Sequence, residues 1–216
     1  MPGARKGQAV WQTTPVRYLN ILVFSFGPTN VTSMAIPFFR RLFSRPEKPA
    51  GETTETRAGN GDAEAQFSLG LRFAREGATQ DYCQAAQWYL KAADQNHSLA
   101  QHNLGIMYAA GQGVARDEVQ SMRWMQKAAD LGDAGAQYRV GMKHHRASFD
   151  GPPEAALESR ILAFKWLELA ATQGYRDSEV ASAFVALGMT RQAVADGRCR
   201  IAAFVAGQAN NQALVT

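Results

Sequence analysis

Side chains that commonly carry chemistry are sparse in this sequence of 216 residues, which has four histidines and two cysteines. The adjacent pair His144-His145 is the sharpest candidate for a metal site, because imidazole is a common zinc ligand. Neighbouring residues on a helix point about 100° apart, however, so both rings cannot reach one ion unaided. Cys83 and Cys199 have no nearby cysteine partner, and we interpret both as small apolar packing residues. The sequence therefore predicts no metal and no other cofactor.

Catalytic motifs are missing as well. The sequence contains no phosphate-binding glycine loop, no Gly-x-Ser-x-Gly elbow and no metalloprotease helix motif. Carboxylate pairs such as Asp117-Glu118 stand where a turn and a helix cap are expected, not beside an acid/base partner. We therefore predict no catalytic residue and no enzymatic activity.

Aromatic and basic side chains recur at helical spacing, a pattern typical of a protein-binding surface or of a packed core. Phe67, His102 and Tyr138 occupy equivalent places in three similar segments. Equivalent places in stacked copies project in the same direction, which predicts a stripe on one face. The predicted partner-contacting residues are Phe67, Arg75, His102, Tyr138, Lys143, His145, Arg146 and Phe149. Packing between neighbouring units is the alternative interpretation of the aromatic members.

Three related segments position these side chains. Each begins with Ala-Gln and has a glycine four residues after the glutamine, and successive copies lie 35 and 36 residues apart. Apolar and small residues within each copy are three or four apart, the spacing of one helix face. The Ala-Gln pairs stand at 65–66, 100–101 and 136–137.

A second motif follows in each copy, a tryptophan with an Ala-Ala pair four residues later. The tryptophans are residues 88, 124 and 166, so their spacings are 36 and 42. About six residues are therefore inserted in the third copy, and we expect them in a loop around Phe149 that borders the binding face. Residues that favour a left-handed turn end the helices, at Gly61, Asn96, Gly132 and Gly174. One such hairpin cannot bury its apolar face alone, which predicts stacking of the copies.

The order of these positions is similar to that of a known family. The stretch AQHNLGIMYAAGQGVARD, followed by Trp, Lys-Ala-Ala and LGDAGAQY, resembles the Sel-one-like repeat, a tetratricopeptide-like unit. The resemblance implies an all-α fold, a right-handed α-solenoid whose first helices line a concave face. It also implies a non-enzymatic scaffold or adaptor that binds a peptide or protein on that face. The expected units are 62–96, 97–132 and 133–174, with a degenerate C-terminal cap at 175–207.

One branch of this family has paired cysteines in its repeats and is associated with penicillin binding or β-lactam hydrolysis. This chain has no such pairs, which disfavours that chemistry. An envelope-localised protein of this kind remains the alternative to a scaffold.

Residues 1–61 form an N-terminal extension without a repeat. The apolar run Tyr18–Phe26 is too short to cross a bilayer, which needs about 20 residues. With basic residues before it and small residues after it, the run resembles a signal peptide, although Asn20 interrupts it. The alternative interpretation is that Met34 is the true start. Residues 46–61 are polar and predict a flexible linker, so the tail is expected to be disordered ahead of a repeat domain at 62–216.

Aromatic residues and arginines alternate after Met34. Such a mixture suits weak contact with an anionic membrane surface. A membrane-tethered adaptor is therefore a third alternative, with contact through Phe38, Phe39, Arg40, Arg41 and Phe43.

Charge is divided unevenly along the chain. Residues 1–61 hold eight Lys/Arg against three Asp/Glu, whereas residues 62–216 hold fifteen against sixteen. The net charge of +4 thus belongs to the extension, and no nucleic-acid surface is predicted on the repeats. Sparse cysteine fits a reducing compartment, so we expect the cytoplasm, or the periplasm or secretion if residues 1–35 act as a signal peptide.

Overall fold

A computed structural model describes residues 52–75 and 81–213, and every regular element in these ranges is an α-helix. The expectations for the signal peptide, the start at Met34 and the membrane contact from Phe38 to Phe43 lie outside the described residues. The helices are α2 (Thr54–Gly59), α3 (Ala63–Arg75), α4 (Tyr82–Asp94), α5 (Ser98–Ala110), α6 (Glu118–Asp130), α7 (Ala134–Ala147), α8 (Pro153–Thr172), α9 (Ser178–Leu187) and α10 (Arg191–Ala213).

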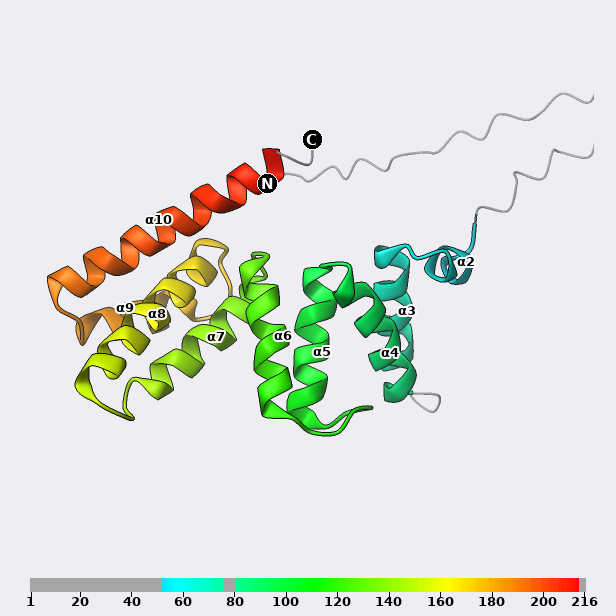
Figure 1. Ribbon diagram of the computed structural model, residues 1–216, viewed down its shortest axis with the longest axis horizontal. Helices are drawn as coiled ribbons and strands as arrows, with labels where there is room; N and C mark the ends of the chain where they lie inside the picture. Colours follow the sequence, from blue (N-terminus) through cyan, green and yellow to red (C-terminus); the bar gives the residue numbers. More distant parts are fainter. Residues whose placement is uncertain (1–51, 76–80, 214–216) are drawn as a thin grey trace, which may run out of the picture. The chain divides into compact units, whose positions relative to one another are not determined.

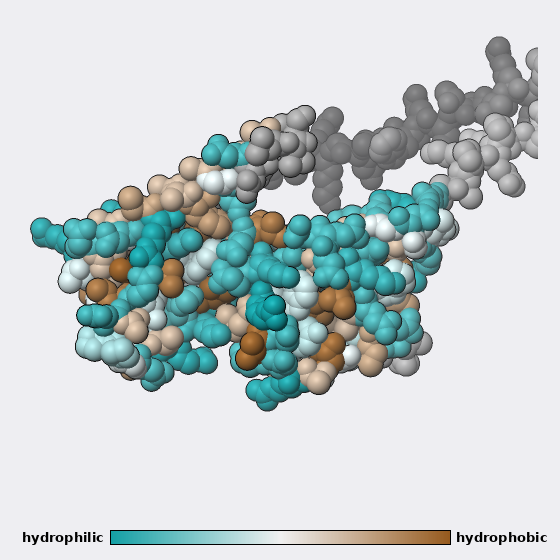
Figure 2. All heavy atoms as spheres, in the orientation of Figure 1, coloured by the Kyte–Doolittle hydropathy of each residue, from teal (hydrophilic) through white to brown (hydrophobic). Residues whose placement is uncertain are grey.

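Consecutive helices pack as hairpins (Figure 1). Helix α3 packs against α4, α5 against α6 and α7 against α8, and the hairpins meet through α4 with α5 and α6 with α7. Helices α9 and α10 both pack against α8. The predicted left-handed turns are confirmed by positive φ angles of 97°, 63°, 93° and 68° at Gly61, Asn96, Gly132 and Gly174. The prediction of an α-solenoid of helix-turn-helix repeats is therefore confirmed. Hydrophilic residues dominate the face of the molecule shown in Figure 2.

A glycine in the first helix of each hairpin allows the second helix to approach closely. A Cβ atom at Gly70 would lie 2.5 Å from the ring of Tyr89, too close for any real contact. The equivalent contacts are Gly70 with Tyr89, Gly105 with Met125, and Gly141 with Leu167. A larger residue at any of these glycines would collide with the facing side chain, so that side chain or its helix would have to shift, because the interior is close-packed.

The recurring tryptophans pack on the core with a cation over one ring face. Lys91 Nζ lies 4.0 Å from the ring centroid of Trp88, and Lys127 Nζ lies 4.1 Å from that of Trp124. Each lysine stands three residues after its tryptophan, so the two pairs share one geometry. An ammonium over an indole face is an attractive arrangement.

The third copy lacks that lysine because α10 covers its position. Leu169 is only 5% exposed and lies in a cluster with Ile201 and Phe204 of α10. An ammonium at this place would lose its hydration without a partner. Lys165 supplies the cation instead, 4.2 Å from the ring centroid of Trp166, and burial lowers the pKa of this lysine.

The residues inserted in the third copy lengthen a helix, which corrects the expected loop. Helix α8 has 20 residues where α6 has 13, while the connection before it shortens from seven residues (111–117) to five (148–152). The added turns hold the C-terminal helices. Glu158 forms an ion pair with Arg200, and Arg160 donates a hydrogen bond of 2.9 Å to the carbonyl of Gly188.

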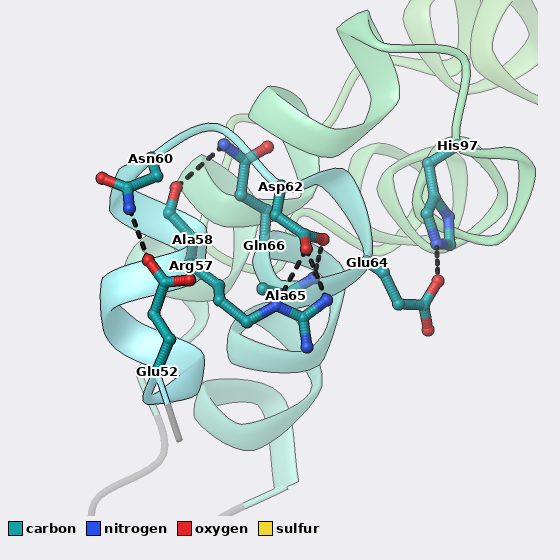
Figure 3. A network of polar contacts seen from close by, with 9 residues as sticks. All are labelled: Glu52, Arg57, Ala58, Asn60, Asp62, Glu64, Ala65, Gln66 and His97. Carbon is teal, nitrogen blue, oxygen red and sulfur yellow. Dashed lines mark hydrogen bonds and ion pairs between the residues drawn. The ribbon is translucent and has the colours of Figure 1, made fainter. Parts of the chain in front are cut away.

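Residues 54–59 also differ from the sequence-based expectation, because they form α2. The hydroxyl of Thr53 caps the helix, Ala58 is buried against α3, and Arg57 forms an ion pair with Asp62 (Figure 3). The prediction of a flexible linker throughout 46–61 is therefore wrong for these residues. The polar composition of residues 54–59 gave no sign that Ala58 is buried or that its carbonyl accepts a hydrogen bond from Gln66.

A buried glutamine joins each hairpin to the helix before it. Its side-chain amide donates to a carbonyl in the last turn of that helix, where the helical ladder leaves carbonyls open. These bonds run from Gln66 to Ala58, from Gln101 to Ala93 and from Gln137 to Ala129, with lengths of 3.1, 2.9 and 3.3 Å. The glutamine of the Ala-Gln motif therefore sets how successive hairpins meet.

The residue after the second helix of a hairpin completes this contact in two copies. Its amide donates to the buried glutamine, in the pairs Gln95 with Gln66 at 2.8 Å and Gln173 with Gln137 at 2.9 Å. Leu131 holds the equivalent position in the second copy. As a result, the buried Oε1 of Gln101 has no hydrogen-bond partner among the described residues.

Replacing Leu131 with Gln should stabilise the protein by about 1 kcal/mol, because the new amide can donate to Oε1 of Gln101. Little apolar burial is lost, since Leu131 is 43% exposed. Urea unfolding at neutral pH measures the change. Leu131→Glu is the matched control, because its carboxylate has the same shape but no donor and should give no gain. A Gln variant no more stable than the Glu variant would contradict this explanation.

A chain that begins at residue 62 should be less stable than one that begins at residue 50, by about 1–3 kcal/mol. Removal of α2 takes away the acceptor of the Gln66 amide and exposes Ala65 and Leu69 to water. Parallel urea titrations of the two fragments compare them directly. Equal unfolding midpoints would show that α2 contributes nothing to the array.

Candidate partner-binding grooves

Two grooves lie where one repeat meets the next. The first groove, between the α3–α4 hairpin and α5, has a volume of about 220 Å³, and the second groove, between the α5–α6 hairpin and α7, about 300 Å³. The first groove is lined by Leu71, Ala74, Tyr82, Tyr89, Asn103, Ile106, Met107 and Gln112. The second groove is lined by Ala109, Glu118, Ser121, Met122, Met125, Tyr138, Arg139, Met142, Lys143, Arg146, Tyr175 and Arg176.

The two grooves occupy the same place in successive repeats. Their corresponding residues are Ala74 and Ala109, Tyr82 and Glu118, Tyr89 and Met125, Asn103 and Arg139, Ile106 and Met142, and Met107 and Lys143. Each groove forms where a first helix packs against the hairpin before it. The two grooves therefore share one backbone frame and differ in the side chains that line them.

The first groove is neutral, since none of its lining residues carries a charge at pH 7. Burial raises the pKa of the Tyr89 phenol, and a hydrogen bond with Asn103 opposes that rise. The polar groups of this tyrosine and this asparagine therefore satisfy each other. Leu71, Ile106 and Met107 supply the apolar part of the lining.

The second groove is basic along α7. Arg139, Lys143 and Arg146 are exposed and stand four and three residues apart, so they share one side of the helix. In the described ranges, no carboxylate forms an ion pair with any of the three. Arg176 adds a fourth cation, 5.5 Å from the ring centroid of Tyr175. Their charge is therefore available to a ligand.

Methionines supply most of the apolar lining of the second groove. Met122 and Met125 come from α6 and Met142 from α7. Thioether side chains are unbranched and polarisable, so they can adapt to ligands of different shape. The groove therefore combines an adaptable apolar surface with a basic wall.

Three of the predicted contact residues meet in the second groove, namely Tyr138, Lys143 and Arg146. Sequence reasoning missed the other basic residues, Arg139 and Arg176, and all three methionines. A comparison of the copies position by position would have revealed Arg139, because the preceding copy has a neutral asparagine there.

The three equivalent side chains of the predicted stripe make contacts between repeats. Each meets the residue that follows the next left-handed turn. The pairs are Phe67 stacked on His97 with centroids 4.5 Å apart, His102 hydrogen-bonded to Asp133, and Tyr138 beside Tyr175 with centroids 5.6 Å apart. Phe67 is buried and His102 lies outside both linings, so of the three only Tyr138 also lines one of the two grooves.

Asp133 shows how firmly one of these junctions is held. Burial raises the pKa of its carboxyl, but hydrogen bonds from His102 and from the backbone N–H of Ala136 outweigh that effect. The pKa of Asp133 therefore lies below its ordinary value. This carboxylate caps α7 and accepts a bond from the preceding repeat at the same time.

The remaining predicted residues lie outside the linings of both grooves. Arg75 is the exposed last residue of α3. The rings of His145 and Phe149 contact each other at a centroid distance of 5.0 Å, and Phe184 of α9 lies 6.0 Å from His145. Phe149 is 71% exposed, so it belongs to a small surface aromatic cluster.

The described residues hold no group of three or more His, Cys, Asp or Glu side chains that could bind a metal ion. Cys83 and Cys199 are both exposed, which corrects their interpretation as packing residues. Cys83 stands in the first turn of α4, and Cys199 stands on α10, where only one side of the helix is covered. None of the described helices is long and apolar enough to cross a membrane.

Comparisons with known structures find the same architecture. The chain is similar to a protective antigen of uropathogenic Escherichia coli strains that displays an SLR fold, with 26% identity and a TM-score of 0.59. That match covers 74% of this chain and 34% of the other, so this chain spans about a third of the length of that protein. It is also similar to a Sel1 repeat protein from Oxalobacter formigenes, with 35% identity, a TM-score of 0.51, and coverage of 60% and 93%.

The family comparison covers the three hairpins themselves. No curated protein sequence matches the chain. The Sel1 repeat matches residues 63–97, 98–133 and 134–175, which together make up more than half of the chain. These segments contain the recurring glutamine, glycine and tryptophan contacts described above. The chain therefore belongs to the Sel1 repeat family.

Proposed function

We propose that this protein is a non-enzymatic scaffold that binds a segment of another polypeptide in its inter-repeat grooves, chiefly in the second. Sel1 repeat proteins generally mediate protein–protein interactions. The observation that carries the proposal is the second groove, a hollow of about 300 Å³ that combines methionines with basic side chains, and whose charged side chains form no ion pair among the described residues.

Two adjacent grooves suit an extended ligand. Helix α5 contributes Asn103, Ile106 and Met107 to the first groove and Ala109 to the second, so both grooves adjoin one helix. A polypeptide that crosses α5 would place side chains in both. Apolar pockets with a few polar groups at their edges are the usual form of ligand sites.

The alternatives have less support. An envelope-localised enzyme would need a catalytic constellation, and the grooves offer none among their lining residues. The membrane-tethered adaptor depends on residues outside the described ranges, and it is compatible with a scaffold.

Filling the second groove should reduce binding, because a bulky side chain occupies the space that a ligand needs. Peptides are first selected from a random displayed library on the full-length chain, and a synthetic copy is titrated by fluorescence anisotropy. Ala109→Trp should weaken its affinity at least about tenfold, or about 1.4 kcal/mol, with little change in melting temperature.

Ala74→Trp is the matched variant, because Ala74 occupies the equivalent place in the first groove. It should weaken binding less than Ala109→Trp. The proposal fails if no peptide is selected, or if neither tryptophan changes the affinity of a selected peptide.

A further inference from the structure

The second groove differs from the first at positions that the fold leaves free to vary. Asn103 and Met107 of the first groove correspond to Arg139 and Lys143 of the second. Both grooves have the same helical frame, so the frame does not require these cations. The first groove serves as an internal reference in which the same positions are neutral.

The residue that faces each of these positions from the preceding hairpin also differs between the two grooves. In the first groove, Asn103 hydrogen-bonds the phenol of Tyr89. In the second, the tyrosine position is held by Met125, whose thioether offers only a weak acceptor. Arg139 therefore has no counterpart of that bond, and none of its five donors is paired with another of the described residues.

Some arginines elsewhere in the described ranges form ion pairs within the chain, whereas others, such as Arg123 and Arg198, form none there. Arg57, Arg72 and Arg200 each pair with a carboxylate. The basic side chains of the second groove do not, although Glu118 lies in the same lining. Four cations against one carboxylate leave this groove with an excess of positive charge.

Lys143 also acts on a neighbouring histidine that lies outside the lining. Burial, and then repulsion from Lys143, hold the pKa of His144 below its ordinary value.

Spacing along α7 indicates the shape of the anion. Arg139 and Lys143 are four residues apart, a rise of about 6 Å along a helix. Alternate residues of an extended chain are separated by about 6.6 Å. An extended peptide alongside α7 could therefore bring carboxylates at alternate positions to successive cations. The methionines beside them offer a surface for an apolar side chain.

We infer that the second groove recognises an acidic polypeptide segment in which carboxylates at alternate positions flank an apolar side chain. This inference rests on the proposed function and specifies the partner's chemistry. Arg139 and Lys143 provide the charge selection, and Met122 and Met142 contact the apolar residue. A guanidinium is well suited to bind a carboxylate through two hydrogen bonds.

The test converts the second groove to the chemistry of the first in the full-length chain. Arg139→Asn with Lys143→Met installs the residues of the equivalent positions. Peptides selected on the parent chain should be rich in Asp and Glu at alternate positions. The double variant should bind such a peptide at least about tenfold more weakly. It should bind the same peptide with Gln and Asn in place of Glu and Asp within about twofold of the parent.

Arg123→Asn with Arg198→Met is the control, because it removes the same charge from exposed residues outside the groove. It should bind the acidic peptide within about twofold of the parent. The melting temperatures of both double variants establish that they are folded.

The outcomes separate the inference from the proposed function. Selected peptides that are not acidic, or equal losses in the exchange and control variants, would overturn the inference and leave the scaffold standing. Selection of no peptide would remove both. Tighter binding of a labelled single-stranded oligonucleotide than of any selected peptide, lost in the exchange variant, would assign the groove to nucleic acid instead.

Discussion

The bond from a buried glutamine amide to the last turn of the preceding helix holds the repeats in register. A buried amide without its acceptor would destabilise the fold, because the free energy of removing it from water would not be offset by a hydrogen bond. Each hairpin must therefore sit where its glutamine reaches the carbonyl before it, as Gln101 reaches Ala93. The glycine contacts set the distance within a hairpin, and this bond sets the step between hairpins. Because both constraints recur in each copy, the two grooves have the same helical frame.

The ends of the described array are covered in different ways. At the start, α2 presents only the last turn of a helix, and this is sufficient to supply the carbonyl for Gln66. At the other end, the long α10 covers the lengthened α8 of the third hairpin, and Leu169 is buried between these two helices. Repeat arrays need such caps because a terminal hairpin has no neighbour on one side.

Equivalent frames with different linings explain how a regular array can acquire selectivity. Residues that hold the register recur in every copy, whereas most residues that face the grooves do not. Tyr89 and Asn103 in the first groove give way to Met125 and Arg139 in the second, with no change in the helices that carry them. The lining of a groove can therefore differ while its helical frame stays the same.

Periodicity alone determined the helices, their pairing and the turns between them, because every copy must satisfy the same close contacts. It failed where a segment occurs once. Helix α2 is too short and polar to show a period, and the inserted residues read as a loop around Phe149 although most of them extend α8.

The candidate site shows the same division. The sequence determined that Phe67, His102 and Tyr138 project alike from their helices. Only the tertiary structure decided that Phe67 stacks on His97, that His102 binds Asp133, and that Tyr138 alone lines a groove. A helical period gives the direction of a side chain from its own axis, whereas the next repeat determines what lies in that direction.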